Sequence, residues 1–233
     1  MPFGYGFYWG DTTWFILIPA LLLSLWAQYA VSSQYKKYSQ SPGKRGFTGA
    51  QVAYDLLAQQ GITDVRVGNT SGKLSDHYDP KRRVVNLSKG VADSSSVAAL
   101  GIAAHEVGHA LQDAEAYGPM KLRAFLIPVA NIGSQAAMPL FLIGLVLSLP
   151  LLQQIGILAF AVAVVFQLIN LPVEFNASRR ALAALSDGGY LAPDEMPGAR
   201  KVLRAAAMTY VASTLMALTQ LLRLLMLSNR RKN

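Results

Sequence analysis

The fold of this chain is decided by a charge-free stretch at residues 124–173, AFLIPVANIGSQAAMPLFLIGLVLSLPLLQQIGILAFAVAVVFQLINLPV. A helix rises about 1.5 Å per residue, so about 20 apolar residues cross the hydrocarbon core of a bilayer. The stretch is too long for one crossing and long enough for two. Leu149–Pro150, followed by Gln153 and Gln154, interrupts the apolar pattern near its middle. The stretch therefore predicts two membrane-spanning helices joined at these residues.

Two further segments have the composition of membrane spans. Residues 12–35 carry no charge, and Trp14, Trp26 and Tyr29 suit the bilayer interfaces, where aromatic rings gather. No basic stretch precedes this segment and no small-residue cleavage site follows it, so we expect a retained anchor and not a signal peptide. Residues 205–222 form the fourth candidate, which we expect to span the membrane or to lie in its interface. The chain is thus predicted to be a mainly α membrane protein with about four transmembrane helices.

The overall composition agrees with a membrane protein. Hydrophobic residues make up 52% of the chain and charged residues 15%, against roughly 25% charged residues in soluble domains. The chain contains no cysteine, which excludes disulfides and cysteine-ligated metals. The net charge of +8 comes from basic residues beside the apolar segments, which suits anionic lipid. We expect no nucleic-acid partner, because no zinc finger or phosphate-binding glycine loop is present.

Basic residues close to the spans predict the orientation of the protein. With four spans, eleven of them fall on one side and three at the C-terminus, residues 230–232, fall on the other. Lysine and arginine gather on the cytoplasmic side of membrane proteins. We therefore expect an integral protein of the plasma (inner) membrane whose catalytic face is cytoplasmic. The eleven are Lys36, Lys37, Lys44, Arg45, Lys121, Arg123, Arg179, Arg180, Arg200, Lys201 and Arg204.

The region between the first two spans predicts a small α+β unit. FTGAQVAYDLLAQQGI, residues 47–62, has the apolar spacing of an amphipathic helix that Gly61 ends. Residues 64–70 and 82–88 are expected to form short strands, because both are rich in valine. Residues 71–80, SGKLSDHYDP, are expected to be a turn-rich connection.

A second helix in this region carries the motif AAHEVGHALQDA, residues 103–114. We expect it to begin near Ser95, with Asp93 or Ser94 as its cap, and to end at Gly118–Pro119. The motif contains two of the three histidines of the chain. Residues four apart share one helix face, so both imidazoles can reach one metal ion.

The motif HEVGH, residues 105–109, is the H-E-x-x-H pattern of zinc hydrolases. In this pattern His105 and His109 bind the metal, and Glu106 acts as general base on a water molecule. Five positions with three fixed also occur by chance, in a helix with polar residues at the edge of a core. Uncharged flanking residues, together with Gly108 as a site of close packing, favour the metal site.

A catalytic zinc ion normally has three protein ligands. Asp113 faces roughly the same way as the histidines, but three ligands along one straight helix converge poorly on one ion. Glu174 is the better candidate, because two spans return the chain to the same membrane surface. The alternative for Glu174 is a solvated ion pair with Arg179 or Arg180.

Four motifs together resemble the YugP-type family of membrane zinc metallopeptidases. They are LSDHYDP (74–80), VNLS (85–88), VAALGIAAHEVGHALQ (97–112) and LPVEFNASRRAL (171–182). The family is similar in outline to the HtpX-type and CAAX prenyl membrane proteases, which also pair HExxH with a later glutamate. The resemblance implies a zincin-like, gluzincin-like α+β catalytic region with a small sheet, one zinc ion per chain, His105, His109 and Glu174 as its ligands, and Glu106 as the base.

The resemblance leaves several neighbouring residues open. An acidic residue is expected two positions after Glu174, where this chain has Asn176, which can still accept a hydrogen bond from a ligating histidine. His77 and Tyr78 either stabilise an oxyanion or belong to a turn, and the turn is favoured. The strand that carries Asn86 is either an edge strand that pairs with substrate or an ordinary strand.

We therefore predict a membrane-embedded zinc endopeptidase that acts on peptides or membrane proteins; no oligomeric state is predicted. The alternative is a non-catalytic scaffold, a pseudo-protease with a structural metal, which the intact Glu106 disfavours. Five parts are predicted: an anchor (1–35), a soluble zincin-like region (36–122), a transmembrane hairpin (123–173), a polar segment with the third ligand (174–204), and a C-terminal transmembrane or interfacial helix with a basic tail (205–233).

Overall fold

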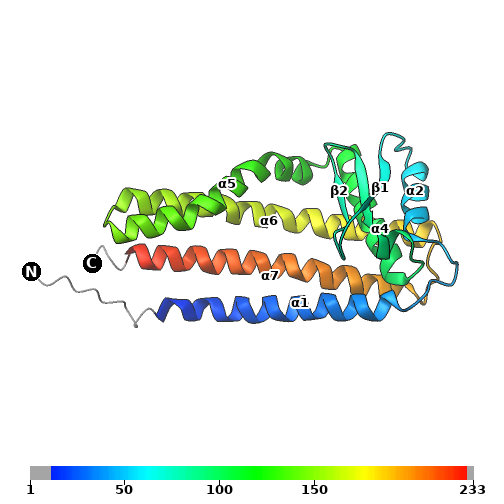
Figure 1. Cartoon of the computed structure of the whole chain (residues 1–233), viewed down its shortest axis with the longest axis horizontal. Helices are drawn as coiled ribbons and strands as arrows, with labels where there is room; N and C mark the ends of the chain where they lie inside the picture. Colours follow the sequence, from blue (N-terminus) through cyan, green and yellow to red (C-terminus); the bar gives the residue numbers. More distant parts are fainter. Residues whose placement is uncertain (1–11, 230–233) are drawn as a thin grey trace, which may run out of the picture.

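The computed structural model describes residues 12–229, which form four long helices, several shorter ones and a three-stranded sheet (Figure 1). In chain order the elements are η1 (Thr12–Leu17), α1 (Ile18–Ser39), α2 (Gly49–Gln59), β1 (Arg66–Thr70), β2 (His77–Asp79), β3 (Val84–Ser88), α3 (Lys89–Ala92), α4 (Val97–Ala114), α5 (Gly118–Val146), α6 (Pro150–Asp187) and α7 (Met196–Asn229). The basic tail at residues 230–233 lies outside the described residues.

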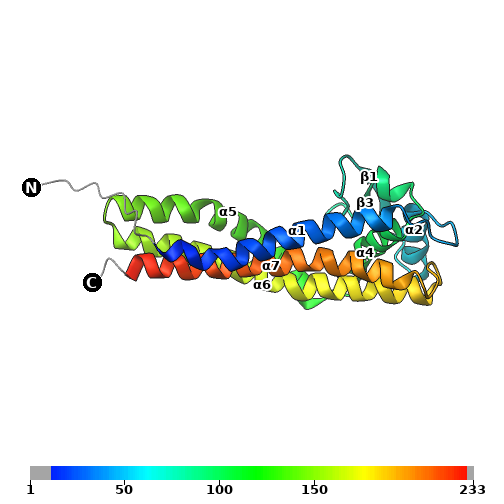
Figure 2. The ribbon, with the colours of Figure 1, turned by 90° about the horizontal axis from the view of Figure 1, so that it is seen from below.

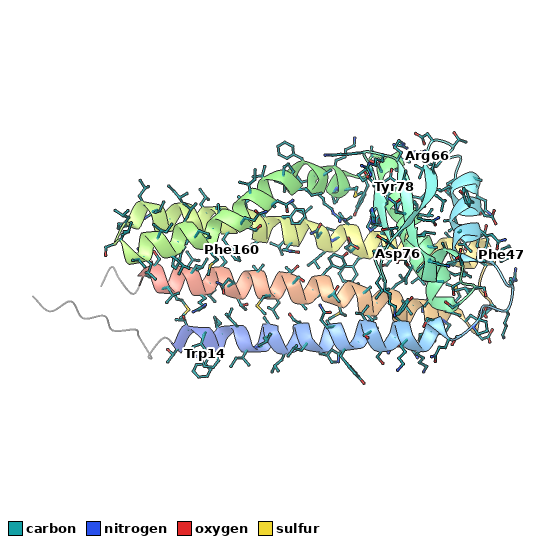
Figure 3. The ribbon with its side chains drawn as sticks, in the orientation of Figure 1. Trp14, Phe47, Arg66, Asp76, Tyr78 and Phe160 are labelled. Atoms are coloured by element: carbon teal, nitrogen blue, oxygen red, sulfur yellow. The ribbon has the colours of Figure 1, made fainter. Side chains whose placement is uncertain are left out.

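Four segments are long and apolar enough to cross a membrane: η1 with α1, then α5, α6 and α7. α5 packs along α6, α6 against α7, and α7 against α1. The four lie lengthwise in one elongated bundle, with the sheet, α2 and α4 at one end (Figures 1 and 2). Trp14 lies toward the opposite end (Figure 3). The predicted mainly α membrane fold with four spans and a small sheet is confirmed.

The bundle is not interrupted where the polar segment 174–204 was predicted. α6 continues without a break to Asp187, and α7 begins at Met196. Most of the segment is therefore helix that continues from the apolar halves of α6 and α7. The predicted turn at Leu149–Pro150 is present, because α5 ends at Val146 and Pro150 begins α6.

The predicted end of the HExxH helix was wrong. α4 ends at Ala114, and Gly118–Pro119 instead begins α5. Proline suits the first turn of a helix, where its missing N–H would have no partner. The predicted cap was also wrong: the Ser96 hydroxyl accepts the hydrogen bond from the Ala99 N–H at 3.2 Å.

The small α+β unit contains the predicted helix and both predicted strands. Thr48 and Gln51 form a reciprocal capping box that begins α2. β1 pairs with β3 in parallel, and β2 pairs with β3 antiparallel, which gives the order β1-β3-β2. The possibility that β3 is an edge strand is therefore wrong. The edge nearest α4 is β2, which the sequence had placed in a turn-rich connection.

α4 is the central element of this unit, and nearly all of its residues are buried. It packs on α2 and β2 on one side and on α6 and α7 on the other. A Cβ atom on Gly108 would lie 2.7 Å from the Ala177 carbonyl oxygen of α6, which is too close for any side chain. A Cβ atom on Gly101 would make an ordinary 3.6 Å contact with the Ala199 side chain of α7. Close approach of α4 to α6 therefore requires glycine at position 108.

We expect Gly108→Ala to destabilise the protein by about 1–3 kcal/mol, because the added methyl group pushes α4 away from the α6 backbone. Gly101→Ala is the matched control on the same helix. It should leave stability unchanged or raise it, since alanine is favoured over glycine in helix interiors by about 1 kcal/mol. The measurement is the thermal unfolding midpoint of both variants in detergent, and equal midpoints would show that the α4–α6 contact is not limiting.

Candidate metal centre

The metal centre begins with two histidines on one face of α4. His105 and His109 are one helical turn apart, and their rings lie 4.7 Å apart with an edge-to-face angle of 79°. His109 is buried and His105 is partly buried. The helix thus holds both Nε2 atoms toward the same neighbour, which is α6.

Glu174 comes from α6 at the level where α6 passes α4. It is among the most buried polar residues of the chain, with a relative exposure of 2%. Its Oε2 atom lies 3.3 Å from His105 Nε2 and 3.6 Å from His109 Nε2. The structure therefore brings together the three residues that were expected as ligands, and their ligand atoms lie within 4.8 Å of one another.

The geometry of these three atoms suits a zinc ion. Tetrahedral zinc with bonds of about 2.0–2.1 Å holds its ligand atoms roughly 3.3 Å apart, close to the separations of Glu174 Oε2 from the two Nε2 atoms. Among the described residues, Oε2 is buried and accepts no hydrogen bond. A buried carboxylate oxygen without a partner is costly, and a bound cation would remove that cost. Two imidazoles and a carboxylate are also a donor set that zinc accepts.

Polar neighbours orient both imidazole rings. The Gln112 side-chain oxygen lies 3.0 Å from His109 Nδ1, and the Gln112 amide donates to the Val173 carbonyl at 2.8 Å. The Ser178 hydroxyl lies 3.2 Å from His105 Nδ1. Hydrogen bonds at Nδ1 fix the ring orientation and leave Nε2 for a metal.

The sequence suggested that Asn176 accepts a hydrogen bond from a histidine. In the structure Asn176 does not contact a histidine directly. Its side-chain oxygen accepts hydrogen bonds from Gln112 at 3.0 Å and from Arg180 at 2.7 Å. Gln112 occupies the position beside His109, because it lies three residues further along the same helix face. Asn176 therefore reaches His109 through Gln112, and Arg180 is itself paired with Glu115.

Glu106 lies beside the three candidate ligands and is held by β2. Its Oε2 atom accepts a hydrogen bond from the Tyr78 backbone N–H at 3.0 Å. Burial raises the pKa of Glu106 to about 6, and the nearby carboxylates of Glu174 and Asp76 add to this. A carboxyl group with this pKa can both accept and release a proton near neutral pH.

The remaining candidate residues have structural partners. Tyr78 donates its hydroxyl hydrogen to Asp113 at 2.8 Å, and burial with this bond raises the pKa of Tyr78 far above its usual value. The Tyr78 hydroxyl is thus bonded to Asp113, and the Tyr78 backbone N–H is bonded to Glu106. His77 is exposed and contacts the Asn86 side chain at 3.2 Å across β2 and β3.

Asp76 and Asp79 show how the DHYDP segment is fixed. Asp76 accepts hydrogen bonds from the N–H and hydroxyl of Ser88, and Asp79 accepts from the N–H groups of Lys81 and Arg82. The turn that the sequence favoured for His77 and Tyr78 was therefore wrong: both residues belong to β2 because they pair with β3, and only Asp79 bonds the local backbone, in the turn that follows.

Two further residues reach the site from the membrane helices. Arg123 of α5 donates to Glu174 Oε1 at 2.9 Å, and Tyr210 of α7 lies near both of these side chains. Sequence reasoning used Arg123 only for topology and missed Tyr210. Their one sequence signal is a polar group near the end of an apolar segment, which does not indicate a partner.

A cavity of about 200 Å³ lies over these residues. It is bordered by β2, α4, α5, α6 and α7, and its lining includes His105, Glu106, His109, Glu174 and Tyr210. The cavity therefore lies where the α+β unit joins the long apolar helices.

Comparison with known proteins identifies the family of this chain. The family model described as "Putative neutral zinc metallopeptidase" matches residues 13–229. A curated protein of Bacillus subtilis (strain 168), "Putative membrane protease YugP", is 48% identical over 213 residues, which are 91% of this chain and 95% of that protein. No solved structure matches. Both matches extend over the membrane helices as well as the HExxH region, and the chain belongs to this family of zinc metallopeptidases.

Proposed function

We propose that the protein is a membrane-embedded, zinc-dependent endopeptidase in which Glu106 is the general base. The observation that carries this proposal is the position of Glu106, a buried carboxylate next to three converging ligand atoms within one cavity. A structural metal site needs no such carboxylate. This favours catalysis over the alternative of a non-catalytic scaffold.

We propose that His105, His109 and Glu174 hold one zinc ion per chain. When bound, zinc polarises a peptide carbonyl and makes water more acidic. Arg123 neutralises the second oxygen of Glu174 and so leaves Oε2 for the metal. Gln112 and Ser178 keep the two rings turned so that both Nε2 atoms face the same point.

Glu106 moves the proton in the proposed reaction. The Tyr78 N–H holds one carboxylate oxygen, so the carboxylate is fixed in orientation and its other oxygen can take a proton from water. The oxygen of that water forms the new bond to the peptide carbon, and the C–N bond breaks. Glu106 then gives the proton to the departing amine.

The expected substrate is an extended peptide or a segment of a membrane protein. β2 is the edge strand of the sheet beside α4, and Asp76, His77 and Tyr78 line the cavity. An extended chain can lie along the edge of a sheet, and we propose that the substrate lies beside β2. The Tyr78 N–H on this edge already donates to Glu106, so the backbone-pairing role considered for β3 does not pass to β2.

We propose that the cavity faces the cytoplasm from the plasma (inner) membrane. Ten of the eleven basic residues used for topology lie on loops or on the parts of α1, α5, α6 and α7 nearest the α+β unit, and Arg123 lines the cavity itself. The α5–α6 turn is at the other end of the bundle (Figure 1).

The ligand assignment predicts that Glu174→Gln loses the metal. A neutral amide replaces the anionic ligand, so zinc affinity should fall more than roughly a hundredfold, since removing even an outer partner costs 10–100-fold. The measurement is zinc per chain by elemental mass spectrometry after dialysis against a weak chelator. Glu115→Gln is the control, because Glu115 pairs with Arg180 at the surface and should keep one zinc. A Glu174→Gln protein with full zinc would contradict the assignment.

The proposed mechanism predicts that Glu106→Gln binds zinc and does not cleave peptides. An amide cannot take the proton, so the rate should fall by about 10²–10⁴-fold. The measurement is cleavage of a broad peptide library, with zinc content determined on the same sample. Wild-type cleavage by a zinc-loaded Glu106→Gln protein would exclude Glu106 as the base, and a wild type that cleaves nothing would favour the scaffold.

The proposed orientation can be tested because the chain has no native cysteine. We expect Gln154→Cys, near the α5–α6 turn, to react with a membrane-impermeant maleimide in intact cells. Lys81→Cys, in the turn after β2, should react only after permeabilisation. Both positions are exposed, so reactivity reports on membrane side and not on burial. The opposite pattern would place the cavity outside the cytoplasm.

A further inference from the structure

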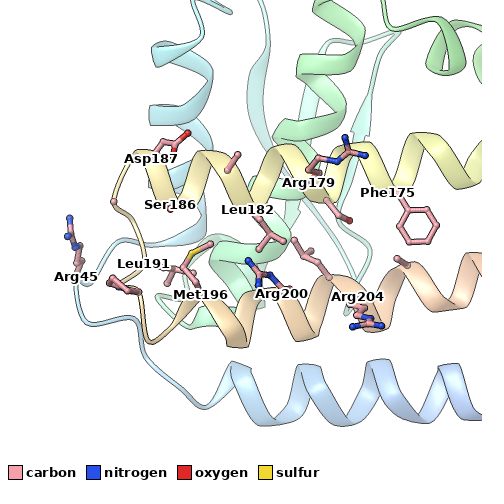
Figure 4. Close-up of a pocket in the computed structure, with 16 residues that line it drawn as sticks. Arg45, Phe175, Arg179, Leu182, Ser186, Asp187, Leu191, Met196, Arg200 and Arg204 are labelled. Carbon is pink, nitrogen blue, oxygen red and sulfur yellow. The ribbon is translucent and has the colours of Figure 1, made fainter.

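A second cavity lies between α6 and α7, away from the metal centre (Figure 4). It is an open groove of about 930 Å³. α6 contributes Phe175, Ser178, Arg179 and Leu182, whose spacing of three and four residues places them on one helix face. Val173 and Glu174 lie on the face that meets α4. The groove and the candidate metal centre therefore lie on adjacent faces of α6, and Ser178 borders both.

The groove is strongly cationic. Its lining contains Arg45, Arg179, Arg200 and Arg204, against one acidic residue, Asp187. Within residues 12–229 none of these four guanidinium groups forms an ion pair with a carboxylate. All four side chains are exposed. They are therefore available to an anion that does not come from the described chain.

Several neighbouring basic residues have protein partners and provide a comparison. Lys44 pairs with Asp194, Arg123 with Glu174, and Arg180 with Glu115. Orientation in the membrane explains why basic residues lie on this side, but it does not explain why four unpaired arginines surround one groove. A guanidinium group binds phosphate oxygens through two parallel hydrogen bonds, which makes phosphate a well-matched ligand.

The rest of the lining is apolar. Leu182 and Leu203 face the groove from α6 and α7, and Figure 4 shows Arg200 extending into the space between these helices, close to Leu182. Phe175 lies at the end of the groove that is opposite Arg45 (Figure 4), and 44% of its surface is exposed. It follows the charge-free stretch 124–173 by two residues, so this end of the groove opens at the edge of the membrane.

We propose that this groove binds an anionic phospholipid from the adjacent leaflet. The phosphodiester contacts Arg200, Arg204 and Arg179, and an acyl chain passes Phe175 into the bilayer. A soluble phosphate or an acidic peptide would use the arginines and leave the apolar end at the membrane edge without a role. Ser178 lines the groove and its hydroxyl is next to His105 Nδ1, so the bound lipid lies one side chain away from the metal centre.

The test is lipid binding to the full-length protein in an uncharged detergent, measured by native mass spectrometry. Phosphatidylglycerol is compared with phosphatidylcholine of the same acyl chains. We expect at least about tenfold tighter binding of phosphatidylglycerol: both lipids carry the phosphodiester, but the choline group of phosphatidylcholine places a positive charge beside the arginines, and about 1.4 kcal/mol of repulsion corresponds to a factor of ten. The double variant Arg200→Gln/Arg204→Gln should lose this preference.

The control is Lys36→Gln/Lys37→Gln, which removes the same charge from exposed positions of α1 outside the groove. It should change phosphatidylglycerol binding less than about twofold. If the glutamine variant of the arginines fails to fold, Arg200→Lys/Arg204→Lys keeps the charge, removes the planar fork, and should bind more weakly than wild type.

Three results would overturn the proposal. Equal binding of the two lipids would remove the requirement for an anion. Equal losses of phosphatidylglycerol binding in Arg200→Gln/Arg204→Gln and in the control Lys36→Gln/Lys37→Gln would show that the effect comes from general surface charge. Displacement of the lipid by the same concentration of glycerol phosphate, or of a glutamate-rich peptide, would show that the groove takes a soluble anion or an acidic segment in place of a lipid.

Discussion

The candidate metal centre depends on the close approach of two helices, α4 and α6, that belong to different parts of the molecule. α4 is buried in the α+β unit, and α6 continues from the charge-free stretch 124–173. They meet where Gly108 lies against the Ala177 carbonyl, and Glu174, one turn before Ala177, thereby reaches both histidines. Larger residues at position 108 would separate the carboxylate from the imidazoles. The membrane hairpin is thus part of the candidate site, and the α+β unit alone lacks the third proposed ligand.

The polar residues behind the histidines follow from the same contact. Gln112 is fully buried, and a buried amide must use its hydrogen-bonding groups. Its oxygen meets His109 on its own helix, and its N–H groups meet Val173 and Asn176 on α6. The Gln112 amide therefore has hydrogen-bond partners for its oxygen and its N–H groups, orients His109, and connects α4 to α6. Packing and ligand geometry are consequently not independent in this protein.

The sequence predicted those features that have a local signal. Long charge-free runs marked the spans, and the histidine spacing marked one face of α4. It missed features that depend on contacts between distant segments. β2 is a strand because it pairs with β3, and Gln112 replaces Asn176 beside His109 because of how α4 and α6 are rotated. Arg123 and Tyr210 reach the cavity only after the bundle is assembled, so neither could be assigned in advance.

The position of the candidate site along α6 reconciles two opposing requirements of the proposed reaction. Hydrolysis consumes water and moves protons, and neither is supported in the hydrocarbon core, where unpaired polar groups are costly. A substrate embedded in the membrane is nevertheless accessible only close to the bilayer. Glu174 is the first charged residue after the stretch 124–173, and Arg123 is the last charged residue before it and pairs with Glu174. The two ends of the hairpin therefore meet at the membrane edge, where Arg123 neutralises a buried carboxylate and where water and the proposed membrane-derived substrate would both be within reach.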